Sequence, residues 1–214
     1  MESSKNNIYL ASEFKNIYTA IGFHPHESKN IKEGDYAILE KLLLDSKNVA
    51  VGEIGLDYYY NHSTKEVQQK AFREQIDLAK KYDLPIIIHD REAHEDTMRI
   101  LKEKARGMKV VLHCFSGDVD MAQWCLKQGY YFGIGGVVTF KNAQKLMKIV
   151  RDIPLNNLLL ETDSPFLTPA PYRGRINEPK YIPLIAKKIA ELKNKKISEI
   201  AKETTFNAEN FFGI

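Results

Sequence analysis

Cysteine is scarce in this sequence, and neither sign of charge dominates it. The two cysteines, Cys114 and Cys125, lie in a predicted strand and in the helix after it, without CxxC spacing. We therefore expect free thiols in a reducing compartment rather than a disulfide. Lys and Arg number 31 against 28 for Asp and Glu, which leaves a net charge of +3. This balance permits a phosphate-bearing substrate but does not by itself indicate a nucleic-acid-binding protein.

Long apolar runs and phosphate-binding glycine loops are also missing. No apolar run approaches membrane-spanning length, and the first residues show no basic region followed by an apolar core. We therefore expect a cytoplasmic protein without a membrane partner. The glycines at 133, 135 and 136 lack the Lys-Ser/Thr pair that follows them in a P-loop, so they are interpreted as a strand with a tight corner.

What the sequence does contain is a regular alternation of apolar, β-rich runs and amphipathic segments. Runs typical of buried strands fall at 17–23, 49–54, 85–89, 109–114, 130–135 and 158–162. Helix-compatible segments lie at 3–14, 33–46, 65–82, 92–106, 118–128, 140–152, 178–193 and 196–212. This alternation predicts an α/β fold with six parallel strands, in one domain that covers residues 1–214.

Four of the predicted strands lead into a side chain that can bind a metal ion. These side chains are Glu53, His89, His113 and Asp163. In a parallel barrel the carboxyl ends of the strands converge on one site, so we expect the four residues to form one metal site. Their spacings of 36, 24 and 50 residues correspond to one, one and two βα units, because a unit of such a barrel has roughly 30 residues.

The strand count also predicts that part of the barrel is absent. Six strands cannot close the eight-stranded TIM-type (β/α)₈ barrel, which averages about 250 residues. We expect a barrel that is truncated at its N-terminal end, lacking a strand, a helix and a second strand, on the order of 40 residues in all. Open edges on strands 17–23 and 158–162 would then favour self-association.

Six ordered motifs support a more specific interpretation. They are GFHP at 22–25, GEIGLDY at 52–58, IHDR at 88–91, HCFSG at 113–117, ETDSP at 161–165 and PYRGRINEP at 171–179. This set resembles the TatD family of metal-dependent deoxyribonucleases, within the amidohydrolase-like barrels, over essentially the whole chain. The resemblance implies a hydrolase that cuts phosphodiester bonds of DNA and needs a divalent cation.

The resemblance also implies a role for each ligand. Glu53 would bridge two metal ions, and His89 and His113 would hold the second ion. Asp163 would bind the first ion and act as general base toward the attacking water, so Asp163 and Glu53 are the candidate catalytic residues.

In the family, the first strand carries a His-x-His pair that completes the first metal position. The chain departs from the family at this point. No such strand is found here, and the pair His24 and His26 matches the family's separate Gly-x-His-Pro motif. We therefore expect one ion to be retained at Glu53, His89 and His113, with activity well below that of an intact relative. The donors suit Zn, Mn, Mg or Ni, and one or two ions.

Four further residues are candidates for binding the phosphate or sugar of the substrate: His24, Tyr58, Arg91 and Arg173. Structural roles remain open for three of them. Arg91 can pair with an adjacent carboxylate, Tyr58 can pack with the neighbouring tyrosines, and Arg173 can orient its loop. For the whole chain, two alternatives stay open: a related barrel metallohydrolase acting on another ester or amide, and a non-catalytic remnant that binds metal, nucleic acid or another chain.

Overall fold

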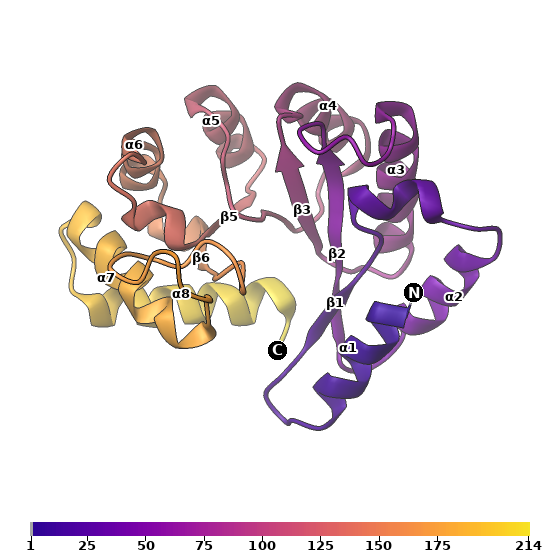
Figure 1. Cartoon of the computed structure of the whole chain (residues 1–214), viewed down its shortest axis with the longest axis horizontal. Coiled ribbons are helices and arrows are strands. Elements are labelled where there is room, and N and C mark those ends of the chain that lie inside the picture. Colours follow the sequence, from indigo (N-terminus) through magenta and orange to yellow (C-terminus); the bar gives the residue numbers. More distant parts are fainter. Residues whose placement is uncertain (1) are drawn as a thin grey trace. The chain divides into compact units, whose positions relative to one another are not determined.

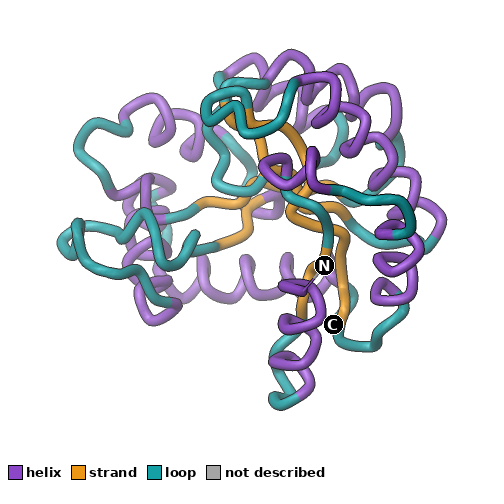
Figure 2. Tube along the Cα trace, turned by 45° about the vertical axis from the view of Figure 1, so that its right-hand side comes forward, coloured by secondary structure: helices purple, strands orange, loops and turns teal. Residues whose placement is uncertain are grey.

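The strands and helices alternate along the chain as the pattern predicts. The computed structural model describes residues 2–214. The strands are β1 (Thr19–Ile21), β2 (Asn48–Asp57), β3 (Ile86–Arg91), β4 (Val110–Leu112), β5 (Tyr131–Ile134) and β6 (Leu158–Leu160) (Figure 1). The α-helices are α1 (Glu2–Ser12), α2 (Asp35–Leu43), α3 (Lys65–Lys81), α4 (His94–Lys104), α5 (Val119–Lys127), α6 (Gln144–Asp152), α7 (Ile182–Lys193) and α8 (Ile197–Phe212). Figure 2 shows the same alternation by colour.

The strand order in the sheet equals the order in the sequence, β1 to β6. The chain divides into two compact units, and the boundary between them falls within β4. The first unit contains the described residues up to Val111 together with Phe212–Ile214, and the second contains Leu112–Phe211. The α/β prediction is confirmed, whereas the single domain over 1–214 stays a prediction. No helix among residues 2–214 is long and apolar enough to cross a membrane.

In the first unit, β2 pairs in parallel with β1 and with β3. The β2 strand runs three residues further than predicted and ends at Asp57, which lies opposite Arg91 of β3. Buried Ile54 and Leu56 of β2 and Ile88 of β3 form part of the core of this unit. The longer strand therefore brings most of the GEIGLDY motif into the sheet.

Gly55 permits a close approach between these two strands. It has a φ of +142° and lies opposite His89, and a Cβ at this position would overlap the His89 carbonyl oxygen. Only glycine combines this conformation with this lack of a side chain. The glycine of the motif thus sets how closely β2 approaches the strand that carries His89.

Helix α3 holds the ends of two strands through buried glutamines. Thr64 caps its first turn by accepting a hydrogen bond from the Val67 N–H. Gln68 accepts from the Asp57 N–H and donates to the Asp57 carbonyl oxygen, at 2.8 and 2.9 Å. Gln75 does the same for Phe23, at 2.6 and 3.1 Å. These bonds satisfy backbone groups where β1 and β2 end, and so position the residues that follow them.

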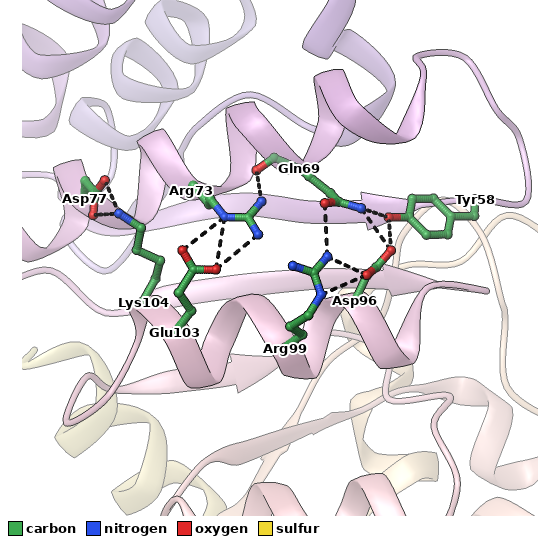
Figure 3. Close-up of polar contacts among 8 residues, drawn as sticks. All are labelled: Tyr58, Gln69, Arg73, Asp77, Asp96, Arg99, Glu103 and Lys104. Atoms are coloured by element: carbon green, nitrogen blue, oxygen red, sulfur yellow. Dashed lines mark hydrogen bonds and ion pairs between the residues drawn. The ribbon is translucent and has the colours of Figure 1, made fainter.

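A polar network joins α3 to α4 on the outside of the first unit (Figure 3). Arg73 pairs with Glu103, and Lys104 of α4 pairs with Asp77 of α3. Nearer to the strand ends, Asp96 accepts hydrogen bonds from the Tyr58 hydroxyl and the Gln69 amide, at 2.8 and 2.9 Å. Arg99 completes the network by bonding to both Gln69 and Asp96. Residues drawn in Figure 3 are Tyr58, Gln69, Arg73, Asp77, Asp96, Arg99, Glu103 and Lys104.

In the second unit, β5 pairs in parallel with β6, with Phe132 opposite Leu158 and Ile134 opposite Leu160. Asp118 caps α5 by accepting from the Met121 N–H. Helix α6 begins at Gln144 rather than at 140 as predicted, because Phe140 is extended and residues 141–142 form a turn. The core of this unit lies between the strands and the apolar faces of α7 and α8, which bury Ile185, Ile189, Ile200 and Phe211.

Candidate metal centre

The first unit brings together three side chains that can bind a metal ion, from three neighbouring parts of its sheet. His24 follows β1, Glu53 lies within β2, and His89 lies in β3. One ligand atom from each lies within 4.8 Å of the others. The Nδ1 atom of His89 is 3.7 Å from a carboxylate oxygen of Glu53. Two imidazoles and a carboxylate are a donor set that suits a divalent cation.

A buried carboxylate, Asp57, sets the orientation of the His89 ring. Its Oδ2 atom lies 3.0 Å from Nε2 of His89 and 2.8 Å from Nε2 of His26. Burial alone would raise the pKa of Asp57, but the Tyr60 N–H and the two imidazoles lower it to about 2. Asp57 is therefore ionised at neutral pH and accepts a hydrogen bond from Nε2 of His89. This leaves the Nδ1 lone pair of His89 directed toward Glu53, as a metal ligand requires.

His24 is held in its neutral form. Burial, with the nearby His89 and His26 rings, lowers the pKa of His24 to about 4. Its Nδ1 atom accepts a hydrogen bond from the His26 N–H at 3.3 Å. Because Nδ1 accepts this bond, the proton of the neutral ring lies on Nε2, which offers a substrate oxygen one hydrogen bond rather than a positive charge.

The second unit carries a comparable arrangement. One ligand atom from each of His113, Cys114 and Asp163 lies within 4.8 Å of the others. One carboxylate oxygen of Glu161 accepts a hydrogen bond from Nδ1 of His113, at 2.9 Å, and the other oxygen accepts one from the Cys114 N–H. The opposite ring atom, Nε2 of His113, lies 3.4 Å from Asp163. Glu161 thus holds His113 as Asp57 holds His89, with the second nitrogen turned toward a candidate ligand.

The backbone around this second set has an unusual geometry. Cys114 and Asp163 adopt φ values of +44° and +56°, in the left-handed region that non-glycine residues seldom occupy. Such conformations persist only where the surroundings impose them, and they are enriched at functional sites. Gly133 of β5 makes room for the Glu161 carboxylate, which a Cβ there would overlap.

The candidate substrate-binding residues are placed in different surroundings. The Tyr58 hydroxyl takes part in the α3–α4 network, and burial, with the bond to Asp96, raises the pKa of Tyr58 to about 12. The guanidinium carbon of Arg91 lies 4.2 and 4.6 Å from two tyrosine ring centroids rather than against an adjacent carboxylate. In the second unit, the exposed Arg173 stacks over Phe140 at 3.8 Å. Their roles toward a substrate stay predictions.

Two carboxylates with a clear structural function were missed at the sequence level. Asp57 and Glu161 both lie inside the six motifs, four residues after Glu53 and two before Asp163. The signal was available, because ligating imidazoles usually bond a carboxylate through their second nitrogen. The prediction that Glu53, His89, His113 and Asp163 share one centre stays a prediction.

Comparison with known proteins places the chain among metal-dependent hydrolases. A family profile described as TatD related DNase matches residues 1–213. The metal-dependent hydrolase YabD of Bacillus subtilis (strain 168) is 48% identical over 206 residues, which are 96% of this chain and 81% of that protein. YcfH of Escherichia coli (strain K12), described likewise, is 39% identical over 96% of this chain and 77% of its own length. The crystal structure of YJJV, a TatD homolog from Escherichia coli K12, matches with a TM-score of 0.93 and 33% identity, over 100% of this chain and 83% of that one.

Fold and relatives together define an α/β metal-dependent hydrolase of the TIM-barrel type, with six parallel strands. An uncharacterized amidohydrolase from Saccharomyces cerevisiae shares the fold at 21% identity, with a TM-score of 0.82. Within this class the chain belongs to the TatD family, because the family profile covers nearly its whole length. The resemblance drawn from the six motifs is confirmed.

Proposed function

We propose that this protein hydrolyses phosphodiester bonds of DNA with the help of a divalent cation. The observation that carries the proposal is the pair of carboxylate-held imidazoles, His89 on Asp57 and His113 on Glu161, each next to a further carboxylate. The donors fit a metal ion, and the family profile that matches the chain is described as TatD related DNase.

The proposed ligands are Glu53 and His89 in the first unit and His113 and Asp163 in the second. A bound divalent ion would lower the pKa of water and stabilise charge on the phosphoryl oxygens. Asp163 is about one-third exposed and ionisable, so we assign to it the removal of a proton from the attacking water. Glu53 would hold the ion beside the reacting phosphate, and the orienting carboxylates would keep both imidazoles ready to bind.

Four residues are proposed to position the DNA. His24, as a neutral ring, would donate one hydrogen bond to a phosphate oxygen, and Arg91 and Arg173 would supply positive charge. Tyr58 would act through its neighbours, because its hydroxyl is already bonded to Asp96. A cytoplasmic location remains part of this proposal, as does an ion that is Zn, Mn, Mg or Ni.

The assay that tests the proposal measures shortening of labelled single-stranded and duplex DNA after loading with each of these four metals in turn. We expect hydrolysis that chelation abolishes, and a loss of roughly 100- to 10,000-fold in Asp163→Asn, as for a general base. Asp152→Asn, at an exposed position of α6, is the matched control. Turnover of simple esters or amides without DNA cleavage would instead assign the chain to another hydrolase. Metal binding with no hydrolysis under any condition would identify a non-catalytic protein.

A further inference from the structure

An exposed aromatic cluster lies beside the first metal-binding set and takes no part in the core. Tyr59 and Tyr60 are 59% and 50% exposed, although large aromatic side chains usually bury most of their surface. Their ring centroids are 4.9 Å apart at an interplanar angle of 88°. The exposed His62 ring stacks on Tyr60, with 5.7 Å between the centroids and 12° between the planes. We call Tyr59, Tyr60, His62 and Arg91 the tyrosine platform.

Arg91 gives the platform a positive charge. Its guanidinium lies over the rings of both tyrosines, at 4.2 and 4.6 Å. It makes no ion pair with any carboxylate of residues 2–214. The charge is therefore available to a phosphate oxygen, while the guanidinium plane offers a further stacking surface.

The platform is fixed in place by the residues of the candidate metal centre. The Oδ1 atom of Asp57 accepts from the N–H groups of Tyr59 and Tyr60, at 3.0 and 2.9 Å. Its other oxygen bonds the rings of His26 and His89. One buried carboxylate thus holds both the imidazoles and the turn that carries the two tyrosines. The arrangement is preorganised, so little conformational entropy is lost when a ligand stacks on it.

We infer that the tyrosine platform binds an unpaired nucleobase of single-stranded DNA next to the phosphate that is cut. This inference rests on the proposed function and adds the form of DNA that the site accepts. Every base has a π face and stacks on aromatic rings, whereas paired bases of a duplex are already stacked on each other. Exposed rings with an adjacent unpaired arginine match the combination of stacking and backbone charge that single strands require.

The test measures binding separately from hydrolysis. Fluorescence anisotropy is recorded with Mg²⁺ present on three labelled, phosphorothioate-linked probes of equal length: a single-stranded oligothymidylate, a strand of abasic sites, and a duplex. We expect Tyr59→Ala and Tyr60→Ala to weaken oligothymidylate binding by roughly 5- to 100-fold, as for the loss of one base–aromatic stack. The same variants should leave binding of the abasic strand and of the duplex unchanged.

Two controls separate stacking from folding. Tyr59→Phe keeps the ring and should bind within about twofold of the unchanged protein, whereas Tyr59→Leu keeps apolar area without a π face and should behave like Tyr59→Ala. Tyr9→Ala, which alters another exposed tyrosine of the first unit, should have no effect. Circular dichroism confirms that each variant is folded.

Three outcomes would overturn the inference: undiminished binding in Tyr59→Ala and Tyr60→Ala, an equal loss on the abasic strand, or competition by an acidic peptide as strong as by DNA. The hydrolysis assay decides the proposed function independently. Base-dependent binding without cleavage would support base stacking on the platform and refute both the nuclease and the placement of the base beside a cut phosphate. Cleavage, with binding unaltered in the tyrosine variants, would support the proposed function and refute the platform.

Discussion

At the scale of single residues, two carboxylates that are not among the proposed metal ligands orient the candidate imidazole ligands of the two units. Asp57 and Glu161 each bond one nitrogen of an imidazole and leave the other turned toward Glu53 or Asp163. Asp57 does more, because it also holds the turn of the tyrosine platform. A side chain that organises this many groups is a sensitive point for mutation.

Asp57→Asn should weaken metal binding by roughly 10- to 100-fold, the usual effect of losing such an outer carboxylate. The amide has no charge with which to stabilise the proton on Nε2 of His89, so the preferred tautomer is lost. Isothermal titration calorimetry with Mn²⁺ measures the change. Asp77→Asn, which removes an exposed carboxylate paired with Lys104, is the matched control. Equal affinity in both variants would show that Asp57 does not orient the ligand.

Tyr58 should make stability depend on alkaline pH. Its pKa is raised from 10.0 to about 12 in the folded chain, so the neutral phenol is favoured by folding. The stabilisation that Tyr58 gives the folded chain is complete below the pKa of Tyr58 in the unfolded chain, near 10, and is lost as the pH rises toward about 12. Tyr58→Phe should lower the free energy of unfolding at pH 8 by about 1 kcal/mol, through lost hydrogen bonds to Asp96 and Gln69.

Urea denaturation of the unchanged protein and of Tyr58→Phe, repeated from pH 8 upward, measures this difference. The difference in the free energy of unfolding between the two proteins should shrink as the pH passes 10, because the unchanged protein then loses the stabilisation from the neutral phenol of Tyr58. A difference that stays constant with pH would contradict the assignment of the raised pKa to Tyr58.

At the scale of elements, helix α3 acts as the support for the strand ends that carry the first set of ligands. Gln68 and Gln75 are seven residues apart, and therefore lie on one face of the helix. They satisfy both backbone groups of Asp57 and of Phe23, which precedes His24. Sequence periodicity identifies the apolar stripe of α3 but does not reveal that these polar residues share the buried face.

Gln75→Leu should lower the free energy of unfolding by about 1–3 kcal/mol, because the backbone N–H and carbonyl of Phe23 would be buried without partners. Leucine has a helix propensity close to that of glutamine, so the helix itself is not weakened. Gln123→Leu, at an exposed position of α5, should change stability by less than about 0.5 kcal/mol. Chemical denaturation compares the two variants, and equal effects would refute the supporting role.

At the scale of the whole molecule, β1 and β6 are the first and last strands in the sheet order. Strands in such positions present backbone groups without a strand neighbour and tend to pair with other chains. Exposed Tyr9, Leu10 and Phe14 of the first unit add apolar surface near the N-terminal end of the chain. We therefore expect self-association that grows with protein concentration.

Sedimentation velocity over a range of concentrations measures this association. Replacing Tyr9 and Phe14 together with lysine should reduce it if apolar surface contributes, and should leave it unchanged if strand edges alone are responsible. A single monomeric species at every concentration, in the unchanged protein, would contradict the prediction.

The element order, the α/β class and the family were predictable from the sequence. Apolar strands and amphipathic helices have different periods, and short motifs at strand ends carry their chemistry locally. The orienting carboxylates and the glutamine bonds from α3 were not predictable, because each joins groups that are far apart in the sequence or hidden within a motif. The same holds for Arg91, which the sequence placed beside two acidic neighbours and the folded chain places over two tyrosine rings. Local pattern determines which residues stand at a strand end, whereas packing determines which way each side chain turns and which partner it meets.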